Sequence, residues 1–232
     1  MIKRSFSDCS ETLKGEALLL SLAGRIIYSY PDDTKKAWYQ SLIQEEVFTE
    51  VPFAPNQGDI IIGLHFLQSW SQSGFASQIY SDMQKEYTRL FIRPGKDIVS
   101  QWESTYFNED RLTFREQTLD VRAWYRRYDL IPEKLYREPD DHIGLELIFT
   151  AHMAQLAVQA LEKRDEASFE ELIQAQKGFL SEHLLRWGPT WCNLVEKNTR
   201  MDFYRGIACI LRGALTELSS IYDLKIPVVN TQ

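Results

Sequence analysis

Cysteine is scarce and scattered in this 232-residue chain. The three cysteines, Cys9, Cys192 and Cys209, are odd in number, lie far apart and never form a CxxC pair. This usage excludes a disulfide framework and is typical of free thiols in a reducing compartment. We therefore predict that the protein is cytoplasmic.

The chain also lacks the marks of several protein classes. It has no lysine- or arginine-rich run and a net charge of −7, which argues against a nucleic-acid ligand. Neither GxxxxGKS/T nor GxGxxG occurs, so the usual phosphate-binding loops are missing. No stretch approaches 18 uncharged apolar residues, and the first residues lack the apolar run of a signal peptide. We predict a protein that is neither exported nor membrane-spanning.

Strand patterns are nearly absent, because no segment alternates β-branched and polar residues between turns. Apolar residues recur instead at helical spacing. This spacing predicts helices at about 13–27, 37–43, 59–70, 75–91, 119–128, 143–161, 169–185, 191–196 and 201–222. The 143–161 segment is apolar on most sides and is therefore the predicted central helix.

The fold class that follows is all-α. With 44% hydrophobic residues the chain can bury a sizeable core. We predict one helical domain over 1–232, a bundle of roughly eight to ten helices in two loosely divided lobes. The lobes are expected at about 1–130 and 140–225, with a hinge at about 129–140 where Pro132 and Pro139 interrupt the chain.

The main functional candidate is an acidic segment just before the central helix, Glu138-Pro139-Asp140-Asp141-His142. A helix start needs one capping residue and favours anionic side chains and a proline in its first turn. A third acid and a titratable ring exceed that need, so a cationic ligand is one interpretation of the cluster. The other is a helix cap surrounded by solvated charge.

Three segments together resemble the TorD/DmsD family of redox-enzyme maturation chaperones. They are residues 87–95 (YTRLFIRPG), 102–106 (WESTY) and 138–145 (EPDDHIGL). The last resembles the family's Glu-Pro-x-Asp-His motif. One departure is the segment 98–101 (IVSQ), which stands where family members often have prolines. The resemblance implies an all-helical, non-enzymatic cytoplasmic chaperone without a cofactor.

By this resemblance the chain binds the twin-arginine leader, the apoprotein, or both, of a molybdopterin oxidoreductase of the DMSO/TMAO reductase type. Guanidinium groups need carboxylate acceptors, and the apolar run of a leader needs a hydrophobic groove. The predicted peptide-binding residues are Glu138, Pro139, Asp140, Asp141, His142, Trp102, Tyr106, Phe91 and Trp124. Arg89 and Pro94 are predicted to give structural support, Arg89 through an internal salt bridge.

Alternatives stay open at this point. The aromatic side chains of the predicted site are also typical of core anchors. A metal-dependent hydrolase using Asp141, His142 and Glu146 is the rival from another class, although a zinc site needs three or four ligands and no HExxH or CxxC occurs. A chaperone for a non-exported molybdoenzyme is the rival within the family. A monomer with a minor domain-swapped dimer is expected, since a short hinge favours swapping.

Overall fold

The computed structural model describes residues 6–72, 77–93, 98–108, 110, 112–132 and 138–227. The chain divides into two compact units, each assembled from segments that are distant in the sequence. The first unit comprises residues 1–28, 101–188 and 218–232, and the second comprises residues 29–100 and 189–217.

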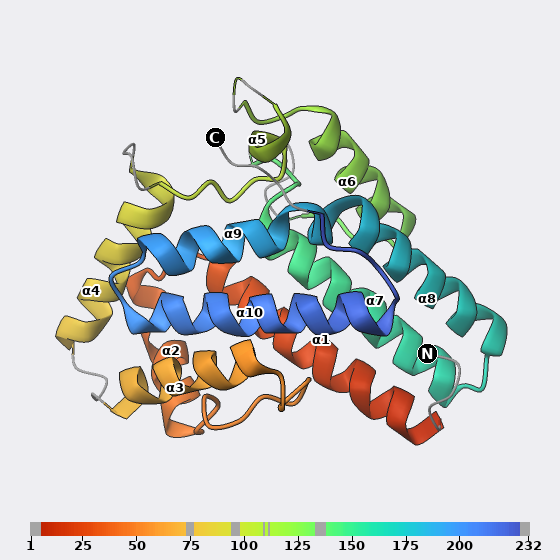
Figure 1. Ribbon diagram of the computed structural model, residues 1–232, viewed down its shortest axis with the longest axis horizontal. Coiled ribbons are helices and arrows are strands. Elements are labelled where there is room, and N and C mark those ends of the chain that lie inside the picture. Colours follow the sequence, from red (N-terminus) through yellow and green to blue (C-terminus); the bar gives the residue numbers. More distant parts are fainter. Residues whose placement is uncertain are drawn as a thin grey trace. The chain divides into compact units, whose positions relative to one another are not determined.

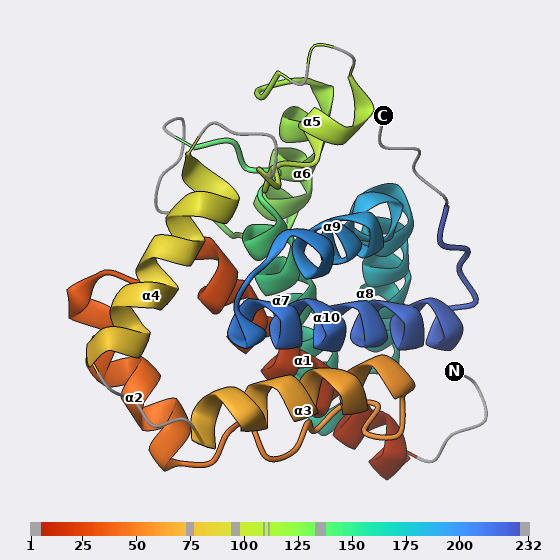
Figure 2. The same ribbon diagram turned by 60° about the vertical axis from the view of Figure 1, so that its left-hand side comes forward.

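The described residues are predominantly helical (Figures 1 and 2). The elements are α1 (Phe6–Tyr28), η1 (Asp33–Lys35), α2 (Lys36–Gln44), α3 (Gly58–Gln72), α4 (Ser77–Tyr87), η2 (Thr88–Ile92), α5 (Ser104–Phe107), α6 (Glu116–Arg127), α7 (Ile143–Glu162), α8 (Glu166–Phe179), η3 (Leu180–Leu184), α9 (Leu185–Asn198) and α10 (Asp202–Ile221). Within these residues no strand forms, and one isolated bridge pairs Trp102 with His142. The all-α prediction is confirmed.

Helical spacing misjudged the start of α9. The pattern predicted a short helix over 191–196, whereas α9 begins at Leu185 and contains Pro189. Proline normally ends a helix because it has no amide hydrogen and its ring clashes with the preceding turn. Here the π-helical turn η3 precedes α9 and already interrupts the regular hydrogen-bond pattern, so the proline is accommodated without ending the helix.

The core of the first unit forms where α1 and α7 run side by side (Figures 1 and 2). Glycines allow this close approach, because a Cβ atom added to Gly144 would lie 2.8 Å from the carbonyl oxygen of Gly24. Leu147, Met153 and Ala154 of α7 are fully buried. The prediction that this helix is buried on most sides is confirmed.

By length and composition α7 also qualifies as a membrane span, the only such helix in the described ranges. However, 67% of the qualifying window is buried inside the structure. A core helix meets the same criterion, and α7 packs as one.

The second unit has its own aromatic core. The ring of Phe203 on α10 lies 4.5 Å from that of Trp70 on α3 and 6.0 Å from that of Tyr39 on α2, measured between centroids. Gly63 and Gly206 let α3 and α10 approach, since a Cβ on Gly63 would come within 2.6 Å of the Gly206 carbonyl oxygen. The second unit therefore has a core of its own, built from α2, α3 and α10.

The predicted hinge at 129–140 falls within the first unit. Residues 133–137 lie outside the described residues, so the division into lobes at this place stays a prediction.

Candidate functional site

His142 is the N-cap of α7. Its backbone is extended, and its Nδ1 accepts a hydrogen bond from the amide of Gly144 at 3.0 Å. The ring is 2% exposed and meets the rings of Tyr28 and Trp102 edge to face, with centroids 5.2 and 5.9 Å apart. In this position the imidazole satisfies one of the unpaired amides at the start of a helix.

Asp141 is completely buried. Its carboxylate accepts hydrogen bonds from the backbone amide of Ser104 at 2.8 Å and from the hydroxyl of Thr118 at 2.7 Å. Its carbonyl oxygen accepts from the amide of Glu103 at 2.9 Å. One side chain thus ties the start of α5, the inner face of α6 and the approach to α7 together.

Asp140 is also completely buried, and its carboxylate accepts a hydrogen bond from the guanidinium of Arg122 on α6. The hydroxyl of Tyr125 donates to its carbonyl oxygen at 3.2 Å. Asp140 and Asp141 were predicted to bind a peptide, which requires exposed carboxylates, and the expectation of exposure is wrong for both. The reason is that α6 supplies Thr118 and Arg122, and no sequence pattern reveals that these face the acidic segment.

A second layer of buried ionisable groups lies in the same unit. Oε2 of Glu103 is 2.9 Å from Nδ1 of His183, and the indole of Trp187 donates to Oε2 of Glu146 at 3.1 Å. Burial raises the pKa of Glu103, although the hydrogen bond from His183 opposes that shift. Burial and the nearby Glu103 and Asp141 carboxylates raise the pKa of Glu146.

The hydrolase interpretation required Asp141, His142 and Glu146 to converge on one metal. Each of them is instead bound to a different partner, as described above. In the part of the chain that the structure describes, no group of three or more His, Cys, Asp or Glu side chains is placed to hold a metal ion.

The remaining residues of the predicted site do not form one exposed surface. Glu138 is half-buried and Pro139 is buried. Trp102 and Tyr106 are half-buried, and the ring of Tyr106 packs on that of Trp187 at 5.0 Å. These side chains contribute packing within the first unit.

Two further predicted residues belong to the second unit, and a third lies outside the described residues. Phe91 is 3% exposed and stacks on Trp191 with centroids 6.0 Å apart, so the expectation that it lines an accessible groove is wrong. Arg89 donates to Glu86 at 2.7 and 2.8 Å and to the carbonyl oxygen of Asn198 at 2.6 Å. Pro94 is not among the described residues.

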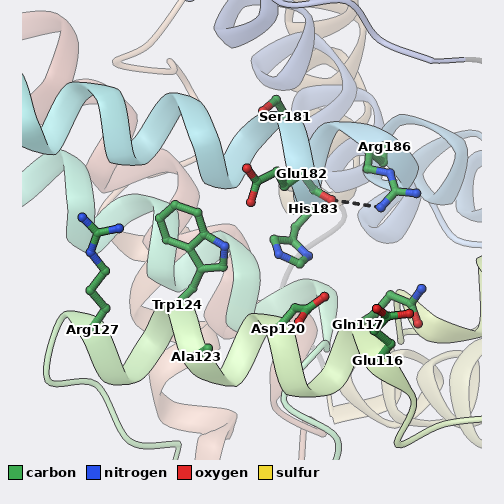
Figure 3. A pocket seen from close by; sticks show the side chains of 10 residues that line it. All are labelled: Glu116, Gln117, Asp120, Ala123, Trp124, Arg127, Ser181, Glu182, His183 and Arg186. Carbon is green, nitrogen blue, oxygen red and sulfur yellow. Dashed lines mark hydrogen bonds between the residues drawn. The ribbon is translucent and has the colours of Figure 1, made fainter.

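An open pocket of about 870 Å³ lies between α6 and the helical run that passes through η3 into α9 (Figure 3). Trp124, a predicted site residue, forms part of its wall. The complete lining is Glu116, Gln117, Asp120, Ala123, Trp124, Arg127, Ser181, Glu182, His183 and Arg186.

The pocket combines unpaired acids with paired bases. Glu116, Asp120 and Glu182 are exposed, and within the described ranges their carboxylates have no hydrogen-bond or ion-pair partner. The guanidinium of Arg127 lies 5.9 Å from the centre of the Trp124 ring and 3.6 Å from Glu171. The free charge of the pocket is therefore negative.

Arg186, the other base, stacks over the ring of Phe107 at 4.3 Å. It also donates to the carbonyl oxygen of Glu182 at 3.2 Å (Figure 3). Asp120 and His183 face each other across the pocket in the same view. Nδ1 of His183 pairs with Glu103. Asp120 has no hydrogen-bond or ion-pair partner among the described residues, so its carboxylate can accept hydrogen bonds from a ligand.

The protein-family model described as nitrate reductase delta subunit matches residues 68–193, just over half of the chain. The chain is 26% identical over 130 residues to the chaperone protein TorD of Aliivibrio salmonicida, which is 56% of this chain and 59% of that protein. It is 24% identical over 151 residues to a probable Tat proofreading chaperone DmsD of Haemophilus influenzae, covering 65% and 67% of the two chains. The chain belongs to the TorD/DmsD family.

Membership confirms the resemblance seen in the sequence, and the two relatives are themselves named as chaperones. The match to the Aliivibrio salmonicida protein spans less than two thirds of that protein's length. Both the acidic segment and the pocket fall inside residues 68–193, the part that the family model covers.

Sequence reasoning missed the three pocket carboxylates. Glu116, Asp120 and Trp124 follow each other at intervals of four, which places them along one face of a helix. That spacing could have predicted a binding surface, since it aligns two carboxylates and an aromatic ring on one face of the helix. Glu182 comes from a distant helix, and only the fold brings it to the same pocket.

Proposed function

We propose that the protein is a chaperone that acts in the cytoplasm and binds the twin-arginine leader, the apoprotein, or both, of a molybdopterin oxidoreductase of the DMSO/TMAO reductase type. The pocket between α6 and η3 receives the arginine side chains. The observation that carries this proposal is a set of three carboxylates, Glu116, Asp120 and Glu182, which lie beside the Trp124 ring and have no partner among the residues that the structure describes.

The chemistry of arginine fits this pocket. A guanidinium is planar, always charged and able to donate two parallel hydrogen bonds to one carboxylate. It also stacks on aromatic faces, as Arg127 already does on Trp124. Each charge-assisted hydrogen bond contributes on the order of 1 kcal/mol in a partly open site, so two arginines give an affinity in the micromolar range together with apolar contacts. Such an affinity suits a chaperone that must release its client.

The acidic motif has a supporting part in this proposal. Asp140 and Asp141 bind the inner face of α6 through Arg122 and Thr118, and this fixes the orientation of the helix. The outer face, with Asp120, is then presented to the pocket. Of the motif, the half-buried Glu138 is the member that we expect to contact a peptide directly.

The test is a titration with a labelled peptide that carries two adjacent arginines, followed by fluorescence anisotropy. Replacing both Asp120→Asn and Glu182→Gln should weaken binding tenfold or more. The matched control is Glu162→Gln, another exposed glutamate of the first unit whose only described ion pair is with Lys14. Unchanged affinity in the double variant, or an equal loss in the control, would contradict the proposal.

The chaperone is proposed to act as a monomer, with a minor dimer formed by exchange of lobes across the 129–140 segment. Size-exclusion chromatography with light scattering measures this directly. A single large, stable oligomer would contradict it.

A further inference from the structure

Three large apolar side chains are exposed within eight residues of one another at the start of α6. Leu112 is 48% exposed, Phe114 52% and Leu119 61%. Single exposed apolar residues are ordinary, but a local group of them is typical of an interaction surface. We call these three residues the α6 apolar patch.

The backbone at Phe114 is held in an uncommon conformation. Its φ angle is 58°, in the left-handed region that costs an L-residue roughly 1 kcal/mol. The next residue, Arg115, is extended and is the N-cap of α6. The chain thus accepts local strain in a turn that leaves an aromatic ring half exposed. Burial of that ring does not compensate for the strain within the protein itself.

The three patch residues are close in sequence to residues that line the pocket. Leu119 precedes the pocket residue Ala123 by four positions, so the two lie in one row along α6. Leu112 and Phe114 precede Glu116 by four and two positions, and Glu116 lies at the same end of the pocket as Arg186 in Figure 3. An extended peptide leaving the carboxylates at this end therefore meets the patch.

We propose that the α6 apolar patch binds the apolar segment that directly follows the arginine pair of the client peptide. This inference rests on the proposed function and assigns a second subsite to it. Charge complementarity selects the occupant: a cationic group next to an apolar run matches three carboxylates next to three apolar side chains. A polar or uniformly basic peptide would leave the patch uncovered.

The experiment compares two labelled peptides by fluorescence anisotropy. One carries two arginines followed by eight leucine and alanine residues, and the other carries two arginines followed by eight glycine and serine residues. The variant Phe114→Ser with Leu119→Ser should bind the first peptide at least fivefold more weakly than the wild type and bind the second peptide equally well. The control is Leu18→Ser, which changes an equally exposed leucine of α1.

Each outcome bears on one of the two proposals. Equal affinity of the patch variant and the wild type for the leucine-containing peptide overturns the patch while leaving the pocket intact. Equal weakening for both peptides assigns the effect to α6 as a whole and also overturns the patch. If the wild type binds neither peptide, the proposed function fails and the patch fails with it.

Two checks keep the result interpretable. Leu119→Lys, a single surface change, serves as a second variant if the double variant unfolds at a lower temperature than the wild type. Light scattering tests the other occupant, a second copy of the chain: a wild-type dimer that the patch variant abolishes would make the patch a self-association surface and overturn the inference.

Discussion

The two faces of helix α6 differ in what their side chains contact: one binds buried carboxylates, and the other lines the pocket. Its inner residues Thr118 and Arg122 bind the buried acids Asp141 and Asp140. Its outer residues Glu116 and Asp120 carry the same kind of charge as those acids, yet they are exposed and have no partner in the described residues. Asp140 and Asp141, which belong to a recognisable sequence motif, form internal hydrogen bonds that stabilise the fold. Glu116 and Asp120, which line the pocket, belong to no recognised motif.

The comparison teaches that burial, not charge, separates the two sets. A buried carboxylate must find donors inside the protein, because desolvation is too costly otherwise. Asp140 and Asp141 have such donors and are completely buried, so a guanidinium from outside does not reach them. The four predictions below test this division, from the largest expected effect to the smallest.

Replacing Arg122→Met should have the largest effect on stability. The change leaves the fully buried Asp140 without the guanidinium that its carboxylate accepts from. Breaking a buried ion pair from one side costs roughly 3 kcal/mol of unfolding free energy. Urea denaturation followed by circular dichroism measures it.

Removing both charges with Arg122→Met and Asp140→Asn should recover part of that loss, because no uncompensated charge remains. A single Arg122 variant as stable as the wild type would mean that the inner face does not hold the acidic segment.

Glu16 provides, for comparison, a buried acid that has no cationic partner in the part of the chain that the structure describes. Its carboxylate accepts from Gln176, which in turn accepts from Tyr222 at 2.6 Å. Burial raises the pKa of Glu16 from 4.5 to about 8. Between these values the folded state binds more protons than the unfolded state, so stability falls as pH rises from about 4.5 to 8.

The variant Glu16→Gln cannot lose this proton. We expect its unfolding free energy to exceed that of the wild type at pH 8, and the difference to be much smaller at pH 5. Urea denaturation at the two pH values gives the difference. If the difference in unfolding free energy between the variant and the wild type does not change with pH, Glu16 does not titrate in this range.

Thr118→Val should have a smaller effect, since it removes one of the two donors to Asp141 and keeps the shape of the side chain. Loss of a hydrogen bond to a buried carboxylate is expected to cost about 1.5 kcal/mol. Thermal denaturation of Thr118→Ser, which keeps the hydroxyl group, provides the control; equal losses in both variants would assign the effect to packing.

Asp120→Asn should leave stability nearly unchanged, within about 0.5 kcal/mol, because an exposed side chain without a partner contributes little to folding. Chemical denaturation checks this. A loss as large as that of Arg122→Met would place Asp120 in the scaffold and remove the contrast between the two faces.

The sequence was sufficient for the all-α class, for the buried central helix and for the family, because hydrophobic spacing and short motifs are local properties. It was insufficient for the orientation of Asp140 and Asp141, which depends on where α6 packs. The same holds for the pocket: Glu116 and Asp120 share a helix, but Glu182 and His183 join them only through the fold. The prediction for Phe91 was wrong because the sequence motif does not show whether an aromatic side chain is buried in the core or exposed in a groove.

The central claim is that outer carboxylates of α6 contact an arginine of the client. A double-mutant cycle measures this contact: the peptide with and without citrulline, the neutral analogue of arginine, is titrated against the wild type, Asp120→Asn and Asp140→Asn. We predict a coupling of about 1 kcal/mol between the arginine and Asp120 and none with Asp140. Coupling to Asp140 without coupling to Asp120 would contradict the account.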